Sequence, residues 1–113
     1  MDWWYVTIAV VAVLVWQLRP VKGIQTMSVA ELKTQLKDKN KVFIDVRTPA
    51  EFQRHNTKPF KNMPLGSDFS SLPKDKEIVV ICQSGMRSKK ACQQLKKLGY
   101  EHVTNVSGGM SRF

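Results

Sequence analysis

Residues 78–95 read IVVICQSGMRSKKACQQL, and this stretch decides the fold class. Its first four residues, Ile78 to Ile81, are all β-branched and do not alternate with polar residues. Such a run predicts a strand that is buried on both faces. Ala91, Leu95 and Leu98 then recur on one face at helical spacing. The stretch therefore predicts a buried strand, a short loop and an amphipathic helix.

The sequence on both sides of this stretch alternates between helical and strand patterns. Ser28 and Glu31 form an S-x-x-E capping box, which predicts a helix that begins there and runs to about residue 37. Short apolar runs predict strands over residues 42–46, 62–65 and 102–106, and a single helical turn is expected over 49–54. This alternation is typical of an α/β domain with an open, mainly parallel sheet and flanking helices.

Cys82 lies at the carboxyl end of the buried strand, where ligands of open α/β sheets bind. Gly85 permits a tight turn in the following loop, whose backbone N–H groups can point inward at the start of the helix. A helix N-terminus and a cation such as Arg87 lower the pKa of a cysteine from about 8.5 to somewhere in about 3.5–7.5. We therefore expect a thiolate that attacks an anionic sulfur or phosphorus donor. The alternative is an inert, buried cysteine beside an ordinary turn.

Five ordered motifs resemble those of one known family. Residues 82–88, CQSGMRS, resemble the C-x-S-G-x-R-S active-site loop of the rhodanese family. The other four motifs are DVR at 45–47 followed by EF at 51–52, NMP at 62–64, GY at 99–100 and SGGM at 107–110. The resemblance implies a rhodanese-like domain over residues 26–113. Residues 53–60, QRHNTKPF, depart from the family's usual G-H-I pattern.

The resemblance also implies a role for each residue of the loop. Cys82 is expected to accept a sulfane sulfur as a persulfide and pass it to an acceptor. The residues expected to bind the substrate are Gln83, Ser84, Gly85, Met86, Arg87 and Ser88. The spacing from Cys82 to Arg87 is C-x4-R, the sulfurtransferase length, whereas related dual-specificity phosphatases have C-x5-R. The expected donor is a small anion such as thiosulfate, the expected acceptor is a thiol or a protein, and no cofactor or metal is implied.

A functional and a structural interpretation are both open for Asp45, Arg47 and Cys92. Asp45 and Arg47 end the strand over 42–46, and they could orient the cysteine loop by hydrogen bonds. We favour an ion pair that serves the fold. Cys92 lies on the apolar side of the helix near Leu95, which favours packing over a role in resolving the persulfide. The two cysteines have no cluster of histidines around them, so a zinc site is not expected.

Other functions remain open at this point. The domain could be a membrane-tethered persulfide carrier or interaction module with little turnover of small molecules. A phosphatase or an arsenate reductase could use the same scaffold, although the loop length argues against both. The formal net charge of +9 suggests an anionic neighbour. Nucleic-acid binding is not expected, because the basic residues are not interleaved with aromatic ones.

The N-terminal residues 3–18 read WWYVTIAVVAVLVWQL and carry no charge. Sixteen helical residues span about 24 Å, and the aromatic residues at both ends suit membrane interfaces. We expect a transmembrane helix over residues 1–19 and a linker over 20–25. A cleaved signal peptide would need a basic start and a small-residue cleavage site, and Asp2 opens this chain instead.

The flanking charges predict the orientation of this segment. Arg19 and Lys22 follow the apolar stretch, and no Lys or Arg precedes it. The positive-inside rule therefore predicts a single-pass protein of the cell membrane with its C-terminal domain in the cytoplasm. A helix that is apolar on every face could alternatively be buried, but this would need a large protein around it.

Overall fold

The computed structural model describes residues 3–18 and 23–113. The described elements, in chain order, are α1 (Trp4–Leu18), β1 (Ile24–Met27), α2 (Val29–Gln35), β2 (Lys41–Asp45), α3 (Pro49–Arg54), β3 (Lys61–Asn62), the 3-10 turn η1 (Phe69–Ser71), β4 (Glu77–Ile81), α4 (Met86–Lys97), β5 (Val103–Val106) and the 3-10 turn η2 (Gly109–Arg112). Strands and helices alternate along the chain, as the sequence patterns predict.

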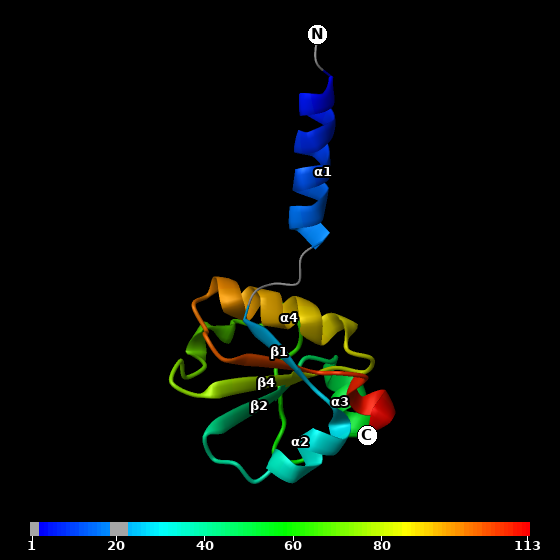
Figure 1. The fold of residues 1–113 in the computed structure, drawn as a ribbon. Helices are drawn as coiled ribbons and strands as arrows, with labels where there is room; N and C mark the ends of the chain where they lie inside the picture. Colours follow the sequence, from blue (N-terminus) through cyan, green and yellow to red (C-terminus); the bar gives the residue numbers. More distant parts are fainter. Residues whose placement is uncertain (1–2, 19–22) are drawn as a thin grey trace.

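The five strands form one parallel sheet in the order β1-β5-β4-β2-β3 (Figure 1). The central strand β4 pairs with β2 and β5, and Ile81 lies opposite Asp45 in the register. The carboxyl ends of β2 and β4 are therefore level with each other. As a result, the residues that follow these two strands, Val46 and Cys82, emerge at the same edge of the sheet.

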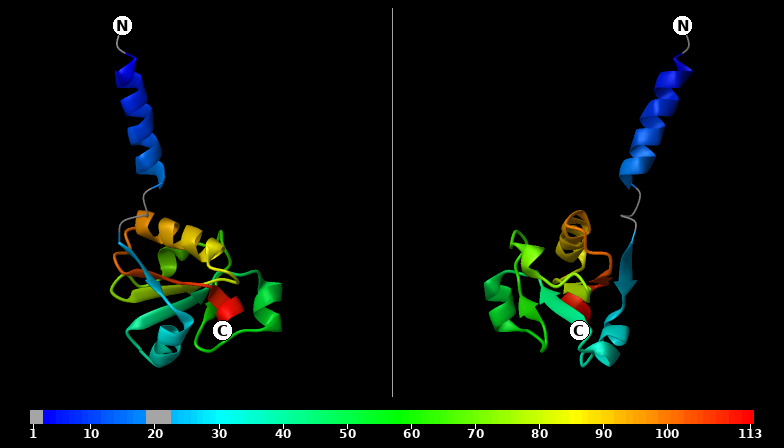
Figure 2. Two further views of the ribbon diagram at one scale, coloured as in Figure 1. Left: turned by 45° about the vertical axis from the view of Figure 1, so that its right-hand side comes forward. Right: turned by 90° about the vertical axis from the view of Figure 1, so that its left-hand side faces the viewer.

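A helix covers each face of the sheet (Figure 2). Ile78 to Ile81 are all 0% exposed, which confirms the prediction of a strand buried on both faces. Val80 belongs to the core cluster that contains Leu95 of α4, whereas its neighbour Val79 belongs to the cluster that contains Leu32 of α2. Successive side chains of a strand point to opposite faces, so a continuous apolar run fills both layers.

Two strands differ from the sequence-based expectation. The strand β1 begins at Ile24, inside the stretch assigned to the linker, and pairs with β5 from Ile24–Val103 to Met27–Val106. Only Met27 of this edge strand is fully buried, so its sequence lacks a clear apolar pattern. The strand β3 is shorter than predicted, because only Lys61 and Asn62 pair with β2.

Among the described residues, the predicted transmembrane helix over residues 1–19 is not found. Residues 1–2 and 19–22, which include both ends of this predicted helix and the first part of the predicted linker, lie outside the described residues. Helix α1 extends over 15 residues and stands apart from the sheet (Figure 1). At a rise of about 1.5 Å per residue it is about 22 Å long, shorter than the roughly 30 Å of a bilayer core. Within residues 3–18 and 23–113, no helix combines the length and apolar character needed to cross a membrane. The side chains of Trp3 and Tyr5 are 70% and 62% exposed.

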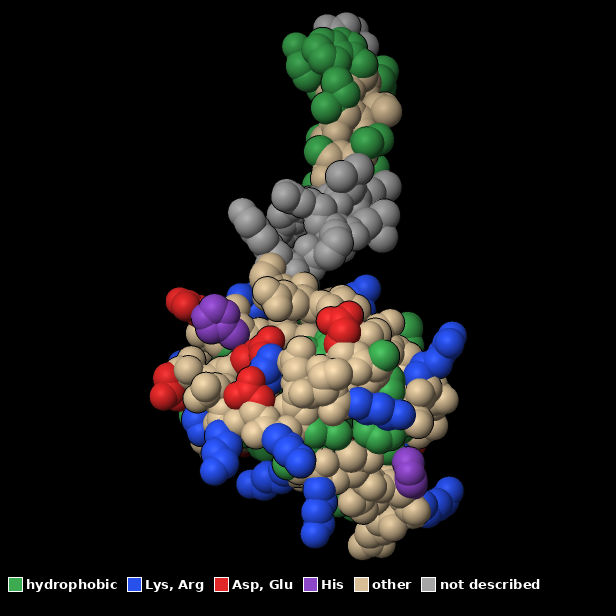
Figure 3. All heavy atoms as spheres, turned by 60° about the horizontal axis from the view of Figure 1, so that its bottom comes forward, with side chains coloured by type: hydrophobic (Ala, Val, Ile, Leu, Met, Phe, Trp, Pro, Cys, Tyr) green, Lys and Arg blue, Asp and Glu red, His purple; other side chains and the backbone are tan. Residues whose placement is uncertain are grey.

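The surface of the domain is rich in basic side chains. Figure 3 shows Lys and Arg spread over the viewed face, with several acidic side chains among them. They do not gather there into a single stripe. A scattered arrangement of this kind is typical of a solvated surface.

Candidate active site

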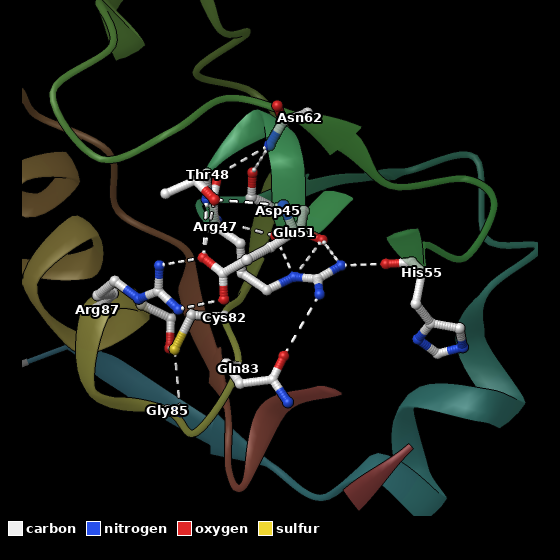
Figure 4. Close-up of polar contacts among 11 residues, drawn as sticks. Asp45, Arg47, Thr48, Glu51, His55, Asn62, Cys82, Gln83, Gly85 and Arg87 are labelled. Atoms are coloured by element: carbon white, nitrogen blue, oxygen red, sulfur yellow. Dashed lines mark hydrogen bonds and ion pairs between the residues drawn. The ribbon is translucent and has the colours of Figure 1, made fainter. Parts of the chain in front are cut away.

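Cys82 begins the loop that joins β4 to α4, and its side chain is 0% exposed. Gly85 ends the loop in the left-handed region, with φ 101°, and α4 starts at the next residue. A side chain is strained at this φ, which explains the glycine. The Gly85 N–H donates a hydrogen bond of 2.9 Å to the Cys82 Sγ (Figure 4). The turn therefore folds the backbone around the sulfur.

The C-terminal turn η2 holds this loop from the other side. The Met110 N–H donates to the Cys82 carbonyl oxygen at 2.8 Å, and the Ser111 N–H donates to the Gln83 carbonyl oxygen at 2.9 Å. Gly109 has a φ of 55°, and a Cβ built on it would lie 2.1 Å from the Cys82 carbonyl oxygen. Only glycine allows the two backbones to approach so closely. The segment that contains the SGGM motif therefore holds the cysteine loop in place by backbone hydrogen bonds.

The surroundings of the sulfur stabilise its ionised form. Burial penalises the thiolate, but the hydrogen bond with the Ser88 side chain and those from the backbone N–H groups of Ser88, Gly85 and Ser84 outweigh it. The pKa of Cys82 is therefore lowered from its ordinary value. This matches the expectation of backbone N–H groups that point inward at the start of a helix.

Asn105 on β5 positions the serine that contacts the sulfur. Ser88 is 0% exposed, and its Oγ lies 3.4 Å from the Cys82 Sγ. The same hydroxyl donates to the Asn105 Oδ1 at 2.5 Å, and the Asn105 Nδ2 donates to the Gly85 carbonyl oxygen at 3.4 Å. Asn105 thus contacts both residues that hold the thiol. Sequence reasoning missed it, and the available signal was a polar residue on a strand adjacent to the cysteine strand, opposite Val80.

Arg87 points at a carboxylate in the structure. Its Nη1 and Nη2 donate to the Glu51 Oε1 and Oε2 at 2.6 and 2.9 Å. Glu51 lies in the first turn of α3, where it also completes a capping box with Thr48. The hydrogen bond from Arg87 is the largest of the effects that lower the pKa of Glu51 to about 2. Hydrogen bonding to Glu51 in turn raises the pKa of Arg87. The binding of a donor by Arg87 stays a prediction, and Glu51 was not among the expected site residues.

Asp45 and Arg47 form the ion pair that the sequence suggested. They are 1% and 2% exposed, and the Arg47 Nη2 lies 2.8 Å from the Asp45 Oδ2. Arg47 also donates to the carbonyl oxygen of His55 and, from Nη1, to the Gln83 Oε1 at 3.4 Å (Figure 4). The pair therefore ties the end of β2 to the segment after α3 and to the cysteine loop.

The exposure of the side chain differs between Met86, which belongs to the predicted site, and the second cysteine, Cys92. The Met86 side chain is 72% exposed, although it belongs to the loop motif. Cys92 is 0% exposed in the core under α4, and burial raises its pKa to about 12. This environment supports the interpretation of Cys92 as a packing residue. Among residues 3–18 and 23–113, no group of three or more His, Cys, Asp or Glu side chains is placed to hold a metal ion.

A cleft of about 320 Å³ opens beside the cysteine loop. It is lined by the residues Arg47, Glu51, Arg54, His55, Gln83 and Met110. The lining comes from α3, the segments around it, the residue after the cysteine and the C-terminal turn. The atypical stretch after α3 therefore contributes directly to the walls of the site.

Comparisons with known proteins agree with this fold and loop. The rhodanese-like domain family matches residues 28–113. A sulfurtransferase of Allochromatium vinosum is 36% identical over 61% of this chain and 67% of its own length. A mitochondrial protein of Arabidopsis thaliana, named High Arsenic Content, is 31% identical over 82% of this chain and 63% of its own length. The crystal structure of a rhodanese-like domain protein from Staphylococcus aureus superimposes with a TM-score of 0.70, at 29% identity, and covers 78% of this chain and 89% of that one.

These relatives support a sulfur-transfer function. The parallel sheet and its flanking helices are those of the rhodanese fold. The family match covers far more than half of the chain and includes the whole cysteine loop. The chain therefore belongs to the rhodanese-like domain family.

Proposed function

We propose that the protein is a sulfurtransferase that carries a sulfane sulfur as a persulfide on Cys82. The observation that carries this proposal is the position of the Cys82 Sγ at the start of α4, where the Gly85 N–H donates to it at 2.9 Å. Ser88 and further backbone N–H groups add to this stabilisation and lower the pKa of the thiol. The thiolate is the nucleophilic form of cysteine, so the site has the form that the chemistry needs.

The proposed reaction has two nucleophilic substitutions at sulfur. The Cys82 thiolate attacks the outer sulfur of a small anionic donor such as thiosulfate, a new S–S bond forms, and sulfite leaves with the electrons of the broken S–S bond. The thiolate of an acceptor then attacks the outer sulfur of the persulfide. The Cys82 thiolate leaves, and the sulfur departs on the acceptor. No metal or redox cofactor takes part in either step.

The second substitution regenerates a charge that the loop already accommodates. The backbone N–H groups of Ser84, Gly85 and Ser88 face the position of the Cys82 sulfur. Such donors cost no reorganisation when charge develops, because they are fixed by the fold. The loop can therefore stabilise the Cys82 thiolate before the first step and after the second.

Intact mass measurement tests the first step. The protein is incubated with thiosulfate and desalted, and a gain of one sulfur atom is expected in the wild type but not in the Cys82→Ser variant. A gain of sulfur by both would contradict the assignment of Cys82. No gain with thiosulfate or with an organic persulfide would remove the sulfur-transfer proposal.

A carrier with little turnover is the second candidate, and the exposed Met86 side chain favours it. This side chain is 72% exposed beside the loop, where a protein acceptor could cover it. Steady-state turnover with thiosulfate and cyanide distinguishes the candidates. An enzyme turns over many times per cysteine, whereas a carrier forms the persulfide once and releases it slowly to small acceptors.

We also propose that the N-terminal segment holds the protein at the cytoplasmic side of a membrane. The support is the exposed apolar surface of α1, where Tyr5 and Ile8 are 62% and 58% exposed. Arg19 and Lys22 after the segment add positive charge, which favours the anionic cytoplasmic face of a membrane. Flotation with vesicles that contain anionic lipid should carry the full chain with the membrane and should leave behind a chain that lacks residues 1–18. Failure of the full chain to float with the vesicles would contradict this proposal.

A further inference from the structure

Most charged side chains that line the cleft beside the cysteine loop form ion pairs, and Arg54 is the exception among the described residues. Arg47 pairs with Asp45, and Glu51 pairs with Arg87 through both of its oxygens. The pKa of Glu51 is about 2, so this pair stays ionised at neutral pH. Arg54, in the last turn of α3, also lines the cleft. In the part of the chain that the structure describes, no ion pair engages Arg54.

The position of Arg54 suits the binding of an anion. Its side chain is exposed, and its guanidinium donates no hydrogen bond to another described residue. A planar guanidinium binds a carboxylate through two parallel hydrogen bonds. An unpaired arginine in a cleft therefore favours a ligand that carries a carboxylate or a similar oxyanion.

The size of the cleft favours an organic molecule over a small inorganic anion. One water molecule needs roughly 10–15 Å³ of cavity volume, so 320 Å³ is far more than a small anion needs. Thiosulfate has only five heavy atoms and would leave much of this space empty. The cleft lining also includes Met110, whose backbone bonds to the cysteine loop and whose apolar side chain can contact a carbon skeleton.

We propose that the cleft binds the body of a small organic thiol that accepts the sulfur, and that Arg54 pairs with the carboxylate of this thiol. This inference rests on the proposed persulfide chemistry at Cys82. Gln83, which lines the cleft, follows Cys82 in the chain, so a thiol bound in the cleft lies beside the cysteine loop. Arg54 is then a residue that determines specificity for the acceptor.

The transfer itself is balanced without another reactant. The thiolate of the bound acceptor attacks the outer sulfur of the Cys82 persulfide and forms a new S–S bond. The S–S bond to Cys82 breaks, and its electron pair stays on the Cys82 sulfur. The products are the acceptor persulfide and the Cys82 thiolate. Arg54 takes no part in the bond changes and acts only through the position of the acceptor.

A pair of thiols that differ in charge tests the proposal. Persulfidated full-length protein is mixed with β-mercaptopropionate or with its neutral amide, β-mercaptopropionamide, and the loss of the extra sulfur is followed by mass. Rates are compared at equal concentrations of thiolate. The wild type should prefer the carboxylate by about tenfold, as expected for one charged hydrogen-bonded contact. Arg54→Gln should lose this preference and keep its rate with the neutral amide.

Lys39→Gln is the matched control, because it removes one positive charge from an exposed side chain between α2 and β2, outside the cleft lining. It should keep the preference of the wild type. Equal preference in Arg54→Gln and Lys39→Gln would overturn the role of Arg54. A wild type without any preference would overturn the carboxylate site itself. High salt should weaken the preference, since an exposed ion pair is screened.

A second measurement does not depend on sulfur transfer. Iodoacetate carries a carboxylate and iodoacetamide is neutral, and both alkylate thiolates. The ratio of their rates at Cys82, relative to the ratio for free mercaptoethanol, should be about tenfold higher in the wild type than in Arg54→Gln. An unchanged ratio would contradict anion binding by Arg54. This result can be read even if Cys82 takes no sulfur from any donor, so failure of the proposed function and failure of the inference are distinguishable.

Discussion

Cys82 and Cys92 belong to the same core cluster, and both are 0% exposed. Their pKa values are nevertheless shifted in opposite directions. The pKa of Cys92 is raised to about 12, because burial penalises its thiolate and nothing compensates for that penalty. The pKa of Cys82 is lowered, although burial acts on it in the same sense. The comparison shows that burial alone does not decide the reactivity of a thiol.

The difference arises from the two positions along α4. Cys82 precedes the helix, so the free N–H groups of the first turn can donate to its sulfur, and the Ser88 hydroxyl lies 3.4 Å from it. Cys92 lies inside the helix, where the backbone N–H groups are already bonded within the helix. A helix therefore offers hydrogen-bond donors to a thiol at its start and none to a thiol in its middle.

The largest expected effect separates the two cysteines by function. Cys82→Ser should abolish persulfide formation, because a hydroxyl is a far poorer nucleophile at neutral pH and cannot hold a sulfane sulfur. Cys92→Ser should keep most of the activity. The measurement is the intact mass after incubation with thiosulfate. A normal Cys82→Ser variant beside an inactive Cys92→Ser variant would move the nucleophile into the helix.

The next effect concerns the charge beside Cys82. Arg87→Ala should lower the efficiency with thiosulfate by roughly ten- to a hundredfold, the size expected for a lost charged hydrogen bond. Glu51→Gln is the matched variant, because it frees the Arg87 guanidinium from its partner. It should raise the efficiency with thiosulfate. If both variants lower it equally, the ion pair serves the fold of the site and Arg87 does not bind the donor.

A smaller effect, on the pKa of Cys82, is expected when the Ser88 hydroxyl beside its sulfur is removed. The lowered pKa means that the thiolate of Cys82 persists to lower pH than that of an ordinary cysteine. Ser88→Ala removes the side-chain hydrogen bond that lowers this pKa, so the midpoint of the alkylation rate against pH should move upward by about one pH unit. Ser84→Ala keeps its backbone N–H and should shift the midpoint less. A midpoint that Ser88→Ala leaves unchanged would assign the lowered pKa to the backbone alone.

The sequence predicted those parts of the site that depend on local order. The apolar run from Ile78 to Ile81 and the loop after it are contiguous, so the buried strand and the start of α4 could be predicted from a short window. The parallel sheet followed from the alternation of strands and helices. These features need no knowledge of which distant segments meet.

The parts that were missed depend on tertiary contacts. Glu51 reaches Arg87 only because α3 packs beside the cysteine loop, and Asn105 reaches Ser88 only because β5 is next to β4. The strand β1 forms by pairing with β5 and has no apolar pattern of its own. The segments around Glu51 and Asn105 do not indicate which distant residues these two side chains contact.

A further expected effect is on stability, and it tests the comparison without any reaction. Cys92→Ser buries a hydroxyl in an apolar part of the core, so it should lower the free energy of unfolding by about 2 kcal/mol. Cys92→Ala leaves only a small void and should cost about 1 kcal/mol. At Cys82 the order should reverse, because a serine hydroxyl there can accept from the Gly85 N–H and bond to Ser88. Urea unfolding of the four variants measures these differences. If serine costs the same at both positions, the two sites do not differ in hydrogen-bond donors, and the different pKa values of the two thiols need another cause.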